Sequence, residues 1–332
     1  MERVKTGCEA VDGLLDGGLA TGTITQVFGE KALGKSIFSF QAACSVASTG
    51  GSAIVLDTEQ SYASYLVPYR LKGMGERFGK EVRVSDLKLE RTVRATGKKK
   101  GASRGELLTA LGGTLDRLGV AYSAAHLAPI ADMLSPSFSV ETPSKEPSVF
   151  VLQAPDVVDL LNLHGVDATK EVSPGGRVEL RLRQTPVYQS VLHEIIRETG
   201  AKLLVYDSIS APFKASFPST QDLPARSAGL AMILSHAQRL CVEFGIAVLV
   251  ISHVSIDPIK AWNRRPYGGI ILGHEAKFSL ELTKAGAKRH GESEDVDRDE
   301  SSNARTFWVA RHPALPDYEV HALSELDEHG FH

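Results

Sequence analysis

The feature that most constrains this chain is residues 23–48, where a strand pattern, a glycine-rich turn and a helix pattern follow one another directly. The turn has the form G-x-x-x-x-G-K-S, whose two glycines let backbone N–H groups curl inward around phosphate oxygens. The helix that follows adds the positive end of its dipole. We therefore predict a nucleoside triphosphate site formed by Gly29, Glu30, Lys31, Ala32, Leu33, Gly34, Lys35, Ser36 and Ile37.

Lys35 and Ser36 carry the expected chemistry of this loop. The lysine side chain is long enough to reach the β- and γ-phosphates, and the serine hydroxyl is an oxygen ligand of the kind that Mg²⁺ prefers. Lys35 is accordingly a candidate catalytic residue, and Ser36 is a candidate metal ligand.

Two apolar runs lead to acids that could complete the site. Residues 52–57 are followed by Glu59, and residues 203–207 end in Asp207. Continuous apolar runs are typical of strands buried on both faces of a parallel sheet, and ligands sit beyond the carboxyl ends of such strands. We therefore expect Glu59 near the phosphates and Asp207 in the magnesium shell. The alternatives are a helix N-terminal acid for Glu59 and an ordinary strand-end acid for Asp207.

His253 follows a third apolar run, residues 246–252, which we expect to be another buried strand. This placement puts the imidazole on the predicted nucleotide side of the sheet. A phosphate-sensing role and a histidine that only satisfies local hydrogen bonds are equally consistent with the position.

The next segment, residues 258–269, combines cations with aromatic side chains. Cations hold phosphates and aromatic rings stack on bases, so this segment is the best candidate for contact with single-stranded DNA. A loop that packs Trp262 on the core is the alternative. The candidate DNA-binding residues here are Lys260, Trp262, Arg264, Arg265 and Tyr267.

The order of patterns predicts an α/β fold built on a mostly parallel, twisted sheet. We expect an ATPase-type core formed by residues 1–79 and 149–332, with an antiparallel hairpin near the C-terminal end. Residues 80–148 are expected to be an insertion, a small helical lobe with a flexible basic loop at 91–100. That loop could contact DNA or could be a solvated loop. A long helix at 223–244 is expected to be interrupted near Gly229.

Composition excludes several other classes of protein. There is no apolar run of about 18 residues and no apolar signal region, so no membrane association or export is expected. The three cysteines are widely spaced and show no metal-ligand spacing, which indicates reduced thiols and a cytoplasmic protein. A net charge of −3 gives no global attraction to nucleic acid.

The ordered set of segments resembles the RecA/RadA recombinase superfamily, with the closest likeness to the archaeal paralogue RadB. The matching pieces include TGCEAVDGLLDGGLATGTITQVFGEKALGKS, VLDTEQSY, LLVYDS and RRPYGGIILGH. The resemblance implies a RecA-type core that uses ATP and Mg²⁺, with Glu59 as the general base and Asp207 as the magnesium-holding acid. It also places Arg226 after a first DNA-binding loop and residues 256–269 in a second. As in RadB, no helix-hairpin-helix domain is expected before the core.

Departures from the family pattern leave three functions open. This chain has His253 where recombinases carry a glutamine that senses the γ-phosphate, and Arg311-His312-Pro313 where they carry an acid that caps a neighbour's ATP. The first hypothesis is an ATPase that binds single-stranded DNA, assists recombination and repair, and can form homo-oligomers. The second is a slow or non-hydrolysing regulatory partner of a recombinase or other repair protein. The third is a KaiC-like signalling ATPase without DNA binding, although Glu59-Gln60 departs from the paired glutamates of that group.

Overall fold

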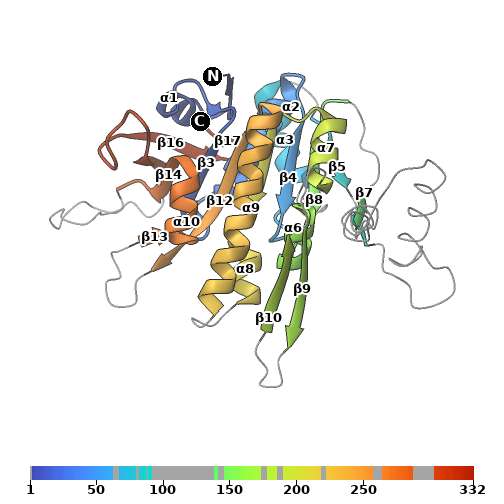
Figure 1. Ribbon diagram of the computed structural model, residues 1–332. Helices are drawn as coiled ribbons and strands as arrows, with labels where there is room; N and C mark the ends of the chain where they lie inside the picture. Colours follow the sequence, from blue (N-terminus) through green and yellow to red (C-terminus); the bar gives the residue numbers. More distant parts are fainter. Residues whose placement is uncertain are drawn as a thin grey trace.

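A computed structural model (Figure 1) describes residues 2–62, 67–79, 82–87, 89–91, 138–140, 146–172, 178–184, 190–217, 222–256, 264–286 and 303–332. Its centre is an 11-stranded sheet. In spatial order the strands are β17 (Gly330–Phe331), β16 (His321–Asp327), β15 (Ala304–Arg311), β14 (Ala276–Lys284), β3 (Ile24–Gly29), β12 (Ala247–Ile256), β11 (Leu203–Asp207), β4 (Ala53–Asp57), β8 (Val149–Gln153) and β5 (Val84–Leu87), with β13 (Arg264–Pro266) paired to β12.

The sheet is mostly parallel. All neighbouring pairs from β14 through β3, β12, β11, β4 and β8 to β5 are parallel, whereas β14 to β17 form an antiparallel meander. This confirms the predicted parallel sheet with an antiparallel hairpin near the C-terminal end. Because parallel strands share their direction, the residues that follow β3, β4, β11 and β12 meet at one edge.

The continuous apolar runs of the sequence arise because helices cover both faces of the sheet. In β4, Ile54 and Leu56 belong to one hydrophobic cluster, while Ala53 and Val55 belong to the cluster on the other face. Side chains alternate between faces along a strand, so a strand covered on both faces needs apolar residues at every position.

Helices fill the two layers around the sheet. Helices α1 (Glu9–Leu14) and α2 (Lys35–Ser48) pack on one face, while α6 (Val157–Leu163), α7 (Val191–Thr199) and α9 (Leu223–Phe244) pack on the other. In Figure 1, α9 crosses in front of the strands. The remaining helices are α3 (Val67–Phe78), α8 (Ala211–Ser216) and α10 (Gly269–Glu275). Within the described residues, no helix is both long and apolar enough to cross a bilayer.

Three small antiparallel ribbons complete the described elements: β1 (Arg3–Val4) with β2 (Leu19–Ala20), β6 (Leu89–Arg91) with β7 (Phe138–Val140), and β9 (Val166–Val172) with β10 (Val178–Gln184). The β9–β10 hairpin extends beyond the body of the molecule, past the end of α8 (Figure 1). The alternation of apolar and polar residues in β10 is therefore that of one strand of a hairpin.

The predicted interruption of the long helix near Gly229 is wrong, because α9 runs without a break over 22 residues. A Cβ atom at Gly229 would lie only 2.8 Å from a ring carbon of Phe213. Gly229 therefore allows α9 to pack closely against α8. From the sequence alone, a glycine needed for close packing cannot be told from a glycine that kinks a helix.

Strand boundaries also differ from the expected ones. Strand β12 continues to Ile256, past His253, because β13 pairs with its last residues. Strand β5 pairs with β8 in the central sheet, although residues 84–87 fall inside the stretch 80–148 that we predicted to be an insertion. The expected helical lobe falls mainly on residues 92–137, between β6 and β7, and these lie outside the described residues.

Candidate functional site

The phosphate loop joins β3 to α2, and two close approaches account for its glycines. A Cβ at Gly29 would lie 2.4 Å from the backbone oxygen of Leu282 on β14. Gly34 caps α2 with a φ of +100°, and a Cβ there would lie 2.7 Å from the side chain of Leu326. Ala32 also has a positive φ of 65°. The loop is thus held in a conformation that side chains rarely tolerate, which is typical of a site that aims backbone N–H groups at a ligand.

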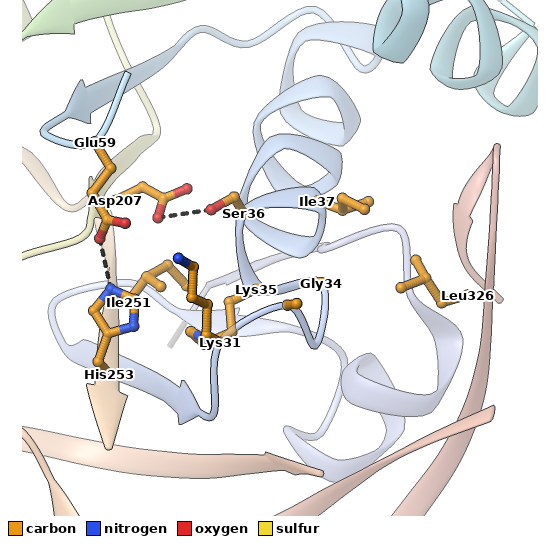
Figure 2. Close-up of a pocket in the computed structure, with 11 residues that line it drawn as sticks. Lys31, Gly34, Lys35, Ser36, Ile37, Glu59, Asp207, Ile251, His253 and Leu326 are labelled. Carbon is orange, nitrogen blue, oxygen red and sulfur yellow. Dashed lines mark hydrogen bonds and ion pairs between the residues drawn. The ribbon is translucent and has the colours of Figure 1, made fainter. Parts of the chain in front are cut away.

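A cavity of about 270 Å³ lies beside this loop. Eleven residues line it: Lys31, Ala32, Gly34, Lys35, Ser36, Ile37, Glu59, Asp207, Ile251, His253 and Leu326. Figure 2 shows Lys35 and Ser36 from the start of α2, Glu59 from the turn after β4 and Asp207 from the end of β11 gathered around this space. Of the predicted nucleotide-binding residues, Gly29, Glu30 and Leu33 belong to the loop but do not line the cavity. The other six candidate nucleotide-binding residues share one pocket with the candidate metal and catalytic residues.

Lys35 is buried at the start of α2, and its Nζ donates to the backbone carbonyl of Glu30. Burial lowers the pKa of the ammonium group, while the nearby carboxylates of Asp207 and Glu59 oppose this change. The lysine thus sits among oxygen acceptors at the position where a phosphate would need a cation.

Asp207 lies at the end of β11, fully buried, opposite the start of α2. The Ser36 hydroxyl donates to Oδ1 of Asp207 at 3.2 Å, and the Ser39 hydroxyl donates to Oδ2 at 2.9 Å (Figure 2 shows the first of these). Burial raises the pKa of the Asp207 carboxyl group to about 6, although both hydrogen bonds oppose that rise. A nearby cation would favour the ionised form.

A hydroxyl and a carboxylate side by side fit Mg²⁺, which takes oxygen ligands and usually binds through one or two protein groups plus substrate phosphates. Among the described residues, no group of three or more histidines, cysteines or carboxylates could hold a metal ion. The donor set at Ser36 and Asp207 therefore suits a metal that arrives with a nucleotide, rather than one held by protein alone.

Asp57 ends β4 directly beside Asp207, yet its carboxylate is fully used by the protein. Its four donors are the backbone N–H groups of Glu59, Ser61 and Tyr62 and the side-chain amide of Gln153, at 2.8 to 3.2 Å. Because these donors occupy the oxygens, Asp57 shapes the turn after β4 instead of binding a metal. Tyr62 also belongs to this turn, and α3 begins at Val67.

Glu59 is carried by this turn and is held by two donors from the neighbouring strands. The Nε2 atom of His253 donates to Oε1 at 2.7 Å, and the Ser208 hydroxyl donates to the same oxygen. The hydrogen bond from His253 is the main cause that lowers the pKa of the Glu59 carboxyl group, with a smaller contribution from Ser208 and against the effect of burial. The carboxylate is therefore ionised and fixed beside the cavity.

The sequence did not indicate Ser39, Ser208 or the role of Asp57. Serine is too common a residue for its type to signal a site, and these contacts join positions up to 168 residues apart. Ser39 had one usable signal, because it lies three residues after Ser36 and so on the same face of α2.

Two of the candidate DNA-binding residues are stacked on each other. The guanidinium of Arg226, on α9, lies 5.2 Å from the centroid of the Tyr267 ring, and it donates to the carbonyl of Phe217 at 2.8 Å. The backbone N–H of Tyr267 donates to the carbonyl of His253 at 2.7 Å. A short chain of contacts thus joins Arg226 to the residue that holds Glu59.

The other candidate DNA-binding residues are less fully described. The backbone of Arg264 and Arg265 forms β13, which pairs with the end of β12 near the cavity. Lys260 and Trp262 lie outside the described residues.

Comparison with known proteins places these features in a family. The family model described as Rad51 matches residues 1–101 and 176–300. The chain is 24% identical to the human "Meiotic recombination protein DMC1/LIM15 homolog" over 85% of this chain and 60% of that protein. It is 22% identical to "DNA repair protein RAD51" of Mycosarcoma maydis, over 96% of this chain and 66% of that protein. The protein of the same name from Saccharomyces cerevisiae is 24% identical over 84% of this chain and 50% of its own length.

The chain thus spans between half and two thirds of the length of these relatives. The family model covers more than half of this chain, including the phosphate loop, the turn with Glu59 and the strand that ends in Asp207. The chain therefore belongs to the Rad51 family of the RecA/RadA recombinase superfamily.

Proposed function

We propose that this protein is a magnesium-dependent ATPase that binds single-stranded DNA and acts in homologous recombination and DNA repair. The observation that carries the proposal is that Lys35, Ser36, Glu59 and Asp207 line one cavity where β3, β4 and β11 end. Membership of the Rad51 family supports the same reading. The finer likeness to archaeal RadB rests on the sequence segments alone, since the relatives reported above are eukaryotic.

In this proposal the phosphate loop and Lys35 bind the triphosphate. The Nζ of Lys35 exchanges its bond to the Glu30 carbonyl for bonds to β- and γ-phosphate oxygens, which are stronger acceptors because they are charged. Backbone N–H groups of the loop and the N-terminal end of α2 add further donors. Ser36 would hold Mg²⁺ directly and Asp207 would hold it through water, and the ion would supply positive charge next to the phosphates.

Glu59 then acts on the attacking water. Both side-chain hydrogen bonds of Glu59 end on Oε1, and none from the described residues ends on Oε2. We assign Oε2 the role of orienting and deprotonating the water, while Ser208 and His253 keep the carboxylate in place. General base catalysis of this kind contributes typically 10²- to 10⁴-fold.

His253 provides the proposed link between nucleotide and DNA. Its side chain holds Glu59, and its backbone carbonyl accepts from Tyr267, on which Arg226 stacks. A change in the position of His253 on nucleotide binding would shift β12 against β13 and so move the segment 256–269, to which we assign the DNA contacts. The backbone of Arg264 and Arg265 forms β13, and we assign the positive charge of these two residues to the same DNA contacts.

A regulatory protein with slow turnover is a second candidate function. The observation that favours it is the double restraint on Glu59, because a carboxylate held by two donors is a weaker base than a free one. Such a protein would bind ATP and a recombinase but would hydrolyse ATP slowly and without stimulation by DNA.

The test is ATP turnover and DNA binding by the wild type and by Glu59→Gln. If the protein is an active enzyme, single-stranded DNA should stimulate ATP turnover by the wild type. Turnover by Glu59→Gln should be lower by about 100-fold or more, while its affinity for the nucleotide should be unchanged. Fluorescence anisotropy with an oligonucleotide, at two salt concentrations and with and without ATP, measures DNA binding. Equal turnover of the two proteins removes Glu59 from its role, and ATP binding without DNA-stimulated turnover selects the regulatory candidate.

Residues 80–148 are proposed to contain a separate lobe, apart from β5. The family match is interrupted between residues 101 and 176, which supports an addition in this part of the chain. Lys98, Lys99 and Lys100 lie outside the described residues. If they contact phosphates, replacing all three by alanine flattens the salt dependence of DNA binding, whereas an unchanged slope assigns them to a solvated loop.

Sedimentation velocity with and without ATP tests the proposed homo-oligomer.

A further inference from the structure

Ser39 completes the surroundings of the Asp207 carboxyl group. It lies one turn after Ser36 on α2, and residues three apart on a helix share a face. Ser36 serves Oδ1 at 3.2 Å and Ser39 serves Oδ2 at 2.9 Å, so one face of α2 presents a hydroxyl to each oxygen. Ser39 is fully buried, and bulk water cannot replace it.

Tyr62 meets Ser39 from the turn that carries Glu59. Its hydroxyl lies 2.7 Å from Ser39 Oγ, and its ring packs on Phe40 with centroids 5.4 Å apart. The Tyr62 side chain is 1% exposed, and its backbone N–H donates to Asp57 at 3.0 Å. Tyr62 therefore connects the turn after Glu59 to α2 through its contacts with Ser39 and Phe40.

The Asp207 carboxylate, as the final acceptor, sets the direction of these hydrogen bonds. A carboxylate only accepts, so the single hydroxyl proton of Ser39 points to Asp207. The Ser36 carbonyl, 3.1 Å from Ser39 Oγ, is the weaker acceptor because it is uncharged. The lone pairs of Ser39 can then accept from the Tyr62 hydroxyl, which lies 2.7 Å from Ser39 Oγ but 3.4 Å from its other acceptor, the Ser36 carbonyl. The result is a directed relay from Tyr62 to Ser39 to Asp207, and bonds in such a chain strengthen one another.

We propose that Ser39 and Tyr62 are positioning residues that orient the Asp207 carboxylate toward the magnesium shell and tie it to the turn that carries Glu59. The inference rests on the proposed magnesium–ATP site. Neither residue lines the cavity, so neither touches the nucleotide, and both act through Asp207.

The test separates metal-dependent from metal-independent nucleotide binding. Affinity for a fluorescent ATP analogue is measured with excess MgCl₂ and with EDTA, for Ser39→Ala, Tyr62→Phe, the double variant and the control Ser45→Ala. Ser45 is a buried serine on the same helix, away from the cavity. Tyr62→Phe removes only the hydroxyl and keeps the ring on Phe40, so it tests the relay even if Ser39→Ala folds poorly.

The relay predicts that the gain in affinity from magnesium falls about tenfold in Ser39→Ala and about threefold in Tyr62→Phe, while affinity in EDTA stays unchanged. Because Tyr62 acts through Ser39, the double variant should be no worse than Ser39→Ala. Three results would each overturn the relay. The first is an equal loss of nucleotide affinity with and without magnesium, and the second is a loss in the double variant that equals the product of the two single losses. The third is an unchanged affinity in both single variants. Wild-type protein that binds no nucleotide overturns the proposed function itself, whereas wild-type binding with unaffected variants overturns only the relay.

Discussion

The Nε2 atom of His253 lies 2.7 Å from Oε1 of Glu59, although 194 residues separate them in the chain. Glu59 follows β4, His253 lies near the end of β12, and Ser208 follows β11, which lies between these two strands in the sheet. The strand order therefore puts two donors beside one carboxylate.

Replacing His253 by alanine should shift the acid limb of ATP turnover to higher pH. The hydrogen bond from His253 is the main cause that lowers the pKa of Glu59, so its loss lets that pKa rise. The sign follows from linkage: the ionised base is present above its pKa and is lost as pH falls through it. Turnover at neutral pH should also fall by about tenfold or more, since the base is less well held. His274→Ala, at an exposed position on α10, is the control, and an unmoved acid limb would contradict the assignment.

The buried histidine pair should make folding stability sensitive to acid. Nδ1 of His164 lies 2.8 Å from Nδ1 of His236, and Nε2 of His164 lies 3.1 Å from the Tyr206 hydroxyl. Burial lowers the pKa of His236 to about 4 and that of His164 well below its usual range. Stability from these neutral rings is complete above about pH 6.5 and is lost as pH falls toward 4.

Urea denaturation at pH 7 and pH 5 measures this effect. As pH falls from 7 to 5, the lowered pKa of His236 alone should reduce the free energy of unfolding by about 2 kcal/mol. His236→Gln keeps a hydrogen-bonding side chain but does not titrate, so its pH dependence should be smaller than that of the wild type by about this amount. An identical pH dependence in both proteins would show that folding leaves the pKa of His236 unchanged.

Two glycine-to-alanine changes should have opposite signs. At Gly229 the added Cβ meets Phe213 at 2.8 Å, so the change should destabilise the protein by about 1–3 kcal/mol. At Gly13, exposed on α1, no atom lies within 4 Å of the added Cβ. That change should stabilise the protein by up to about 1 kcal/mol, because alanine favours helix. Thermal denaturation of both variants checks the pair, and stabilisation by Gly229→Ala would mean that α8 and α9 are not tightly packed.

Arg226→Lys should weaken binding of single-stranded DNA without changing its salt dependence. The lysine keeps the charge but loses the flat group that stacks on Tyr267, which should cost about threefold to tenfold in affinity. Arg239→Lys, exposed on the same helix, serves as the control. A flatter salt dependence in Arg226→Lys would instead indicate that the guanidinium of Arg226 contacts phosphate directly.

The phosphate loop, the parallel sheet and the strand-end positions of Glu59 and Asp207 could be predicted from the sequence because each has a local cause. A strand covered on both faces needs an unbroken apolar run, and a loop around phosphates needs glycine at set positions. These patterns can be recognised in short segments because they do not depend on contacts with distant parts of the chain.

The partners of these residues could not be predicted in the same way. Whether Gly229 breaks a helix or admits a ring depends on Phe213, which belongs to another helix. Likewise, the role of Asp57 depends on donors from the backbone of its own turn and from Gln153 on another strand. These outcomes are decided by tertiary contacts, which no single segment encodes.

The packing of Phe331 and Leu326 beneath Gly34 has a consequence for the growing chain. These side chains are the nearest neighbours of the glycine that caps α2, and the backbone of Phe331 exchanges two hydrogen bonds with Gln41 on the same helix. A ribosome that has translated the phosphate loop must still add nearly 300 residues before this support exists. The support of the phosphate loop is therefore in place only after the strand that carries Phe331 has been synthesised and has paired with Gln41.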